Sequence, residues 1–184
     1  MTYNAPHLIV PIAPMISSLG EYAVGLEARF RNIGAAASGT WAAARYISYV
    51  PCWVPQTVTV QKMWWLNGVT LSGNVDCGIY ASASGLPSGL LISTGTVAQA
   101  APSSAVQSFS VTNINLAPDL YFLAMSMDNT TGTVFRVAPN LPILQELGCV
   151  QQTPAGFGLP SSATAISQTQ TSLPVFGFST VSTI

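Results

Sequence analysis

The stretch TVTVQKMWWLNGVTLSGNVDCGIYAS, residues 57–82, decides the fold class. Its first half alternates polar and apolar side chains with the period of two that is typical of a half-buried β-strand. The pairs Asn67–Gly68 and Gly73–Asn74 supply turn residues, and a second apolar run follows them. Parallel strands need a crossover of a dozen or more residues, which this short connection cannot supply. The stretch therefore predicts two neighbouring antiparallel strands.

Similar runs continue on both sides of this stretch and are separated by turns rich in Gly, Asn and Ser. Short strands at such regular spacing favour an antiparallel sandwich over a parallel sheet. We predict an all-β, jelly-roll-like antiparallel β-sandwich over residues 44–139. The expected strands are 46–50, 57–66, 74–82, 90–94, 106–111, 120–127 and 133–137.

The N-terminal residues 1–43 differ from this central part. Pro6, Pro11 and Pro14 prevent a continuous helix at the start of the chain. Farther on, residues 21–33 place Tyr22, Leu26 and Phe30 at a spacing of four, which favours a short helix, although Gly25 weakens it. We therefore predict an N-terminal arm that contains about three helical turns at most.

The C-terminal residues 140–184 are rich in Pro, Gly, Gln, Ser and Thr, and Glu146 is their only charged residue. A disordered tail is one interpretation. We favour an extended arm that lies across a partner, because Phe157, Phe176 and Phe178 would otherwise be left in water.

Charge is the most informative feature of the composition. Only 6% of the residues are charged and the formal net charge is −1, whereas a typical soluble domain has roughly 25% charged residues. A nearly neutral, apolar surface is better tolerated where other chains cover it. The five basic residues are scattered, which argues against a nucleic-acid partner.

The sequence contains no run of about 20 apolar residues, so we expect no membrane span. No basic segment precedes the first apolar run, so we expect no signal peptide and synthesis in the cytoplasm.

Residues suited to catalysis or metal binding are few. His7 is the only histidine, and Cys52, Cys77 and Cys149 lack the close pairing of metal motifs. We interpret the cysteines as buried thiols and expect no cofactor or metal.

Three acids within the predicted sandwich could be considered as a glycosidase pair. Asp119 and Asp128 fit turns in which the carboxylate binds nearby backbone. Asp76 lies within a strand, where we expect it to form an ion pair with Arg136 or Arg45 or to face outward. We therefore predict that the protein is not an enzyme.

Aromatic residues are the remaining candidates for a functional role. Trp64 and Trp65 are adjacent on a predicted strand, so their side chains must point to opposite faces. One fills the core, and the other needs cover from an arm, a partner or a ligand such as a glycan. Tryptophan is enriched in protein interfaces. We predict contacts with other chains at Trp41, Trp64, Trp65, Phe157, Phe176 and Phe178.

Two stretches also carry a resemblance. VDCGIYASASGLPSGLLISTGTVAQ (75–99) and LYFLAMSMDNTTGTVFRV (120–137) resemble a β-sandwich domain of structural proteins in tailed bacteriophages. That family shows a V-D-V-G-I-Y-D strand and turn, an L-x-S-T-G strand, a Y-Y-L-A strand and a T-G-T-F-F-R hairpin. Ala81 and Asp119 depart from this pattern. The resemblance covers about residues 44–137.

The resemblance implies a component of the virion. A small chain with uncharged arms and no repeats fits a capsid cement or decoration protein better than a long fibre. Such a protein is expected to form homotrimers that bind the major capsid protein. The alternative is a tail or tail-fibre module that binds a receptor or glycan; a glycan hydrolase of the tail would need Asp76 or Asp128.

Overall fold

The computed structural model describes residues 21–24, 36–100 and 102–180. Of the residues that it describes, 55% lie in strands and 4% in a helix. Every pairing between its named strands is antiparallel. The sheets pack against each other, which confirms the predicted all-β sandwich.

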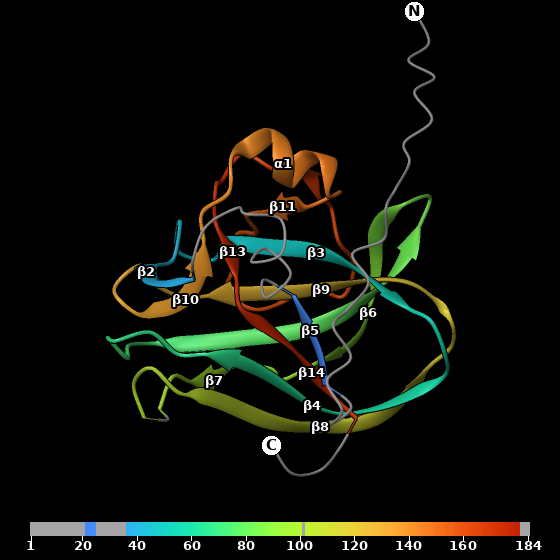
Figure 1. Cartoon of the computed structure of the whole chain (residues 1–184), viewed down its shortest axis with the longest axis horizontal. Helices are drawn as coiled ribbons and strands as arrows, with labels where there is room; N and C mark the ends of the chain where they lie inside the picture. Colours follow the sequence, from blue (N-terminus) through green and yellow to red (C-terminus); the bar gives the residue numbers. More distant parts are fainter. Residues whose placement is uncertain (1–20, 25–35, 101, 181–184) are drawn as a thin grey trace, which may run out of the picture.

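The first sheet has four strands in the order β1-β14-β4-β8. It lies in the lower part of Figure 1. Its strands are β1 (Glu21–Val24), β14 (Phe176–Ser179), β4 (Val58–Leu66) and β8 (Val106–Leu116).

The second sheet has seven strands, six of them in the order β12-β11-β3-β9-β5-β6, while β7 pairs with β5. Three long central strands contain most of its buried residues: β3 (Ile47–Val54), β9 (Asp119–Met127) and β5 (Asn74–Ala83). The other strands are β6 (Leu86–Ser93), β7 (Val97–Ala98), β11 (Val150–Gln152) and β12 (Ile166–Ser167).

A smaller sheet has the order β13-β10-β2. It comprises β13 (Leu173–Pro174), β10 (Thr133–Val137) and β2 (Ala37–Thr40). A short helix, α1 (Leu141–Glu146), leads from β10 to β11 and lies at the top of Figure 1.

The main core lies between the two larger sheets. Met63 and Trp65 of β4 and Phe178 of β14 belong to the same buried cluster as Leu123 and Met125 of β9. Strand alternation sends Phe122 and Ala124 of β9 to the opposite face, where they join a second cluster. Leu159, Ala163 and Ala165 pack on this second cluster. Both faces of β9 are therefore covered, which explains why its sequence is almost continuously apolar.

The C-terminal segment differs from the extended arm that we predicted. Its described part completes the sandwich, because β11 pairs with β3, β13 with β10, and β14 lies between β1 and β4. Phe176 lies opposite Trp65 and Phe178 opposite Met63. Phe176 and Phe178, which we predicted to need a partner chain, are covered by the chain's own core.

The N-terminal prediction also needs a correction. Glu21–Val24 forms β1 instead of the first turn of a helix, because it pairs with β14 along its full length. The rest of the predicted helix lies outside the described residues, as do the prolines of the predicted arm.

Candidate functional site

Most of the aromatic residues predicted to contact other chains lie inside the sandwich. Trp65, Phe176 and Phe178 are fully buried, Trp41 is 2% exposed and Trp64 is 5% exposed. The Trp41 Nε1 donates to the carbonyl of Tyr46 at 2.9 Å, and the Trp65 Nε1 donates to the Asn67 Oδ1 at 2.9 Å. These side chains stabilise the fold and have no surface to offer a partner.

Trp64 and Trp65 do point to opposite faces, as strand geometry requires. Trp65 belongs to the main core, while Trp64 packs with Val175 and with the half-buried Leu66 and Phe135. The outward tryptophan is thus covered by its own chain. Phe157 is half-buried. Of the four tryptophans only Trp53 is exposed, at 38%, so the tryptophans do not form an aromatic platform for a sugar.

Asp76 is buried beneath the C-terminal segment and forms neither of the predicted ion pairs. Its Oδ1 accepts hydrogen bonds from the Ser93 Oγ at 2.6 Å and the Thr94 Oγ1 at 3.3 Å. Its Oδ2 accepts one from the backbone N–H of Leu159 at 2.8 Å. Sequence patterns could not reveal this role, because Leu159 lies 83 positions away. The carboxylate fastens the segment around Leu159 to β5.

Asp128 differs from the predicted turn role, because its carboxylate binds mainly Asn74, 54 positions away in the chain, while Asn129 binds the N–H groups of the turn. The Asp128 Oδ1 accepts from the backbone N–H of Asn74 at 2.9 Å, and its Oδ2 accepts from the side chain of Asn74 at 2.6 Å. Partial burial alone would raise its pKa, but these bonds and one from Asn129 hold the pKa below its usual value. Asp119, at the other end of β9, accepts a hydrogen bond from the N–H of Leu120 at 2.7 Å.

The three cysteines are buried, as predicted. Burial raises the pKa of Cys77 well above its usual value and raises that of Cys149 to about 12, so both side chains are protonated at neutral pH. No group of three metal-ligating side chains occurs in the described part of the chain. His7 lies outside that part. No helix among the described residues is long and apolar enough to span a membrane.

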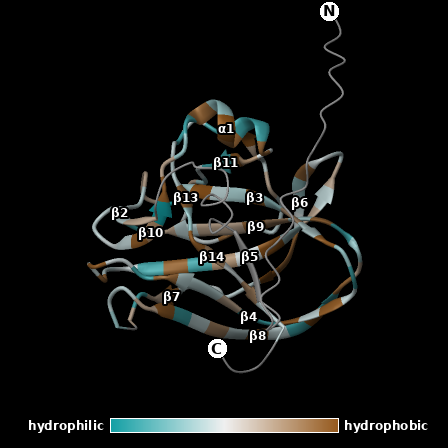
Figure 2. Ribbon diagram, in the orientation of Figure 1, coloured by the Kyte–Doolittle hydropathy of each residue, from teal (hydrophilic) through white to brown (hydrophobic). Residues whose placement is uncertain are grey.

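The surface is poor in charge. Among residues whose exposure the structure describes, the charged residues that are exposed are Arg45, Asp119 and Glu146. Brown and pale segments predominate along the strands in Figure 2. Exposed large apolar side chains occur on edge strands: Phe109 of β8 is 43% exposed, Leu91 of β6 is 42% exposed and Ile166 of β12 is 62% exposed.

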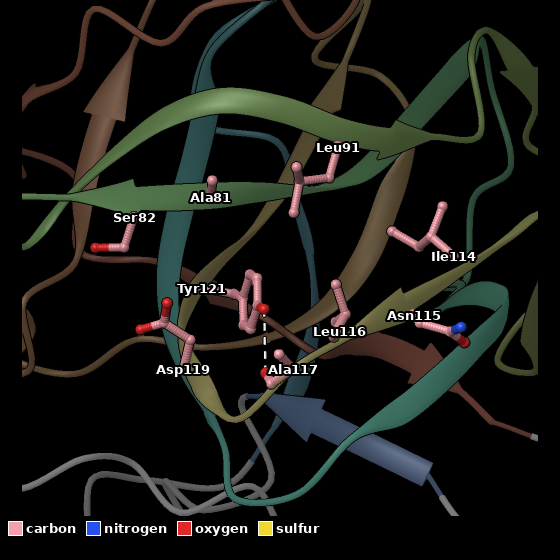
Figure 3. Close-up of a pocket in the computed structure, with 9 residues that line it drawn as sticks. All are labelled: Ala81, Ser82, Leu91, Ile114, Asn115, Leu116, Ala117, Asp119 and Tyr121. Atoms are coloured by element: carbon pink, nitrogen blue, oxygen red, sulfur yellow. Dashed lines mark hydrogen bonds between the residues drawn. The ribbon is translucent and has the colours of Figure 1, made fainter.

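An open pocket of about 380 Å³ lies where β6 and β8 border the sandwich. Leu91 and Ile114 point into it, with Tyr121 at its centre and Asp119 at one side (Figure 3). The Tyr121 hydroxyl donates to the carbonyl of Ala117 at 3.1 Å. We call this pocket, together with the outer edge of β8, the β6–β8 opening, and it is the candidate interaction site of the protein.

The chain was also compared with known proteins. No family model matches it, and no curated protein matches it.

Proposed function

We propose that this protein is a non-enzymatic structural component of a bacteriophage virion, and most specifically a capsid cement or decoration protein. The observation that carries the proposal is the combination of a charge-poor surface with an uncharged strand edge at the β6–β8 opening. Such a surface suits contacts with many other chains. The sequence resemblance is what supports the place in a virion.

The physical basis of the function would be burial of apolar surface against copies of the chain and against the major capsid protein. Each 100 Å² of apolar surface removed from water contributes roughly 2.5 kcal/mol before the entropic costs of association. Repeated over a shell, many modest contacts would resist the pressure of packaged DNA. Homotrimers are the arrangement that the resemblance implies.

Five of the six residues predicted from the sequence are buried and would not mediate these contacts, whereas Phe157 is half-buried and stays a prediction. The buried tryptophans and Phe176 and Phe178 keep the sandwich rigid, while Phe109 and Leu91 offer exposed apolar surface. A rigid sandwich with few exposed apolar side chains at one opening would bind without first reorganising its core.

Immunogold electron microscopy on purified particles tests this proposal. Label spread regularly over the head, together with lower heat resistance of particles that lack the protein, is the expected result. Label confined to the tail, or none on particles, would overturn the assignment to the capsid. Deleting residues 140–184 is not a usable test, because it removes the interior strand β14.

A tail module that binds a glycan is the second candidate, and the pocket at the β6–β8 opening is the observation that favours it. Its volume falls within the range of small-molecule sites, and Tyr121 with Asp119 offers an aromatic side chain beside a carboxylate. Glycan-array binding that is lost in Asp119→Ala would support this function.

A further inference from the structure

Strand β8 is a long edge strand that lacks two of the usual protections, charged residues and proline. Among the described strands it pairs only with β4, so its other side carries backbone N–H and C=O groups that no described strand binds. Natural edge strands are commonly blunted by charged residues or proline. The eleven residues of β8, VQSFSVTNINL, include neither.

The comparable edge of the second sheet is treated differently. The N–H of Leu90 in β6 donates to the carbonyl of Ser161 at 2.9 Å, and the N–H of Ala163 donates to the carbonyl of Ser88 at 2.8 Å. The chain's own C-terminal segment thus covers part of β6. The contrast indicates that the exposed edge at β8 serves a partner.

The register of β8 shows which side chains face the core side. Phe109 lies opposite Met63 and Ile114 lies opposite Val60, and both partners are fully buried. Directly opposed residues share a face of the sheet. Phe109 therefore points toward the core side of the sheet, yet 43% of it is exposed, and no described strand pairs with the outer side of β8.

An irregularity divides β8 into two regular runs. The register shifts between Val60 and Lys62 of β4, so that 106–110 and 114–116 of β8 are regular and 111–113 are not. An antiparallel strand paired with itself would place the first run of one copy beside the second run of the other. The irregular residues would then lie at the two-fold axis, between the two regular runs of the new ladder.

We propose that β8 pairs antiparallel with β8 of a second copy of this chain, which joins the two four-stranded sheets into one. In the register that matches core-side faces, Phe109 of each copy lies opposite Ile114 of the other. Ile114 lines the pocket, so each Phe109 closes the mouth of its partner's pocket. The uncharged edge lets two copies meet without like-charge repulsion.

This inference rests on the self-association within the proposed function and names its surface. The contact is isologous, because the same patch serves both copies. It gives a two-fold dimer, which differs from the homotrimer that the resemblance implies. The mass of the oligomer in solution distinguishes these two arrangements.

Light scattering across a dilution series, combined with hydrogen exchange, tests the inference. We expect a mass of twice 19.2 kDa at high concentration, together with slower exchange of β8 amides than in the diluted monomer. Phe109→Lys should abolish both effects. Ile166→Lys is the matched control, since Ile166 is also an exposed apolar residue on an edge strand of the other sheet, and it should leave both effects intact.

A monomer at all concentrations, a trimer, or a dimer whose β8 amides exchange at the monomer rate would overturn the inference. Circular dichroism and thermal unfolding of Phe109→Lys establish that the variant is folded; if it is not, Ser110→Lys on the same edge replaces it. Particle labelling is independent of these measurements. A capsid label with a monomer in solution would therefore defeat this inference alone, and a β8 dimer absent from particles would defeat only the proposed function.

Discussion

Replacing Phe176 with alanine removes a fully buried aromatic ring from the centre of the first sheet. Phe176 lies on β14, opposite Trp65 on one side and Val24 on the other. Because strands flank it on both sides and the second sheet packs over it, little can move to fill the cavity. Buried Phe→Ala changes cost about 3–5 kcal/mol. That is a large share of a total stability of roughly 5–15 kcal/mol.

The assay is equilibrium unfolding in guanidinium chloride, followed by tryptophan fluorescence at a low protein concentration so that association does not contribute. With a slope of roughly 4 kcal/mol per molar, the midpoint should fall by about 1 M. Phe109→Ala is the matched control, because the same ring is removed from a site that is 43% exposed. Its midpoint should fall by no more than about a third as much.

Equal shifts in the two variants would refute the reasoning. They would mean that β14 does not occupy the first sheet in solution, and that residues 140–184 form the free arm that the sequence suggested. A large shift for Phe176→Ala alone supports the strand order β1-β14-β4-β8.

Three further predictions concern other parts of the molecule. Asp76→Ala leaves the N–H of Leu159 and the hydroxyl of Ser93 without their acceptor. We expect the free energy of unfolding to fall by about 1–3 kcal/mol and the Leu159 amide to exchange its hydrogen faster. An unchanged exchange rate at Leu159 would contradict the role of Asp76 in holding this segment. Gly73→Ala should lower the thermal unfolding temperature clearly more than Gly85→Ala. Both glycines have positive φ, but an added Cβ meets the side chains of Asn129 and Asp128 at Gly73 and nothing within 4 Å at Gly85. Burial raises the pKa of Tyr46, Tyr49 and Cys149 to about 12, so the free energy of unfolding should be highest below the pKa values of the unfolded chain and should fall as pH rises through about 9 to 12. Urea midpoints that stay constant over that range would contradict this expectation, and Tyr46→Phe should make the fall with pH less steep.

The central strands could be predicted because their pattern is local. Residues 57–66 and 74–82 alternate or run apolar between clear turn residues, and the structure places β4 and β5 there. The cysteines were predicted as buried thiols for a similar reason, since isolated cysteines pack as small apolar side chains.

The C-terminal strands could not be predicted from local pattern. Phe176–Ser179 is only four residues long and includes a glycine, so neither its length nor its composition indicates a strand. It becomes one because β4 offers a partner from more than a hundred residues earlier in the chain. For the same reason the sequence alone predicts that Phe176 and Phe178 contact other chains, whereas the contacts they make lie within this one.

The interior place of β14 also has a consequence for synthesis in the cell. Leu66 at the end of β4 and Phe176 at the start of β14 are 110 positions apart. At roughly 5–20 residues per second, a ribosome makes β4 about 5–20 s before β14. During that interval the nascent chain presents the apolar residues of β4 with one neighbouring place in the sheet still empty, where strands of other nascent chains can pair. Slow translation of the intervening segment should therefore lower the soluble yield, and a chaperone that shields β4 should restore it.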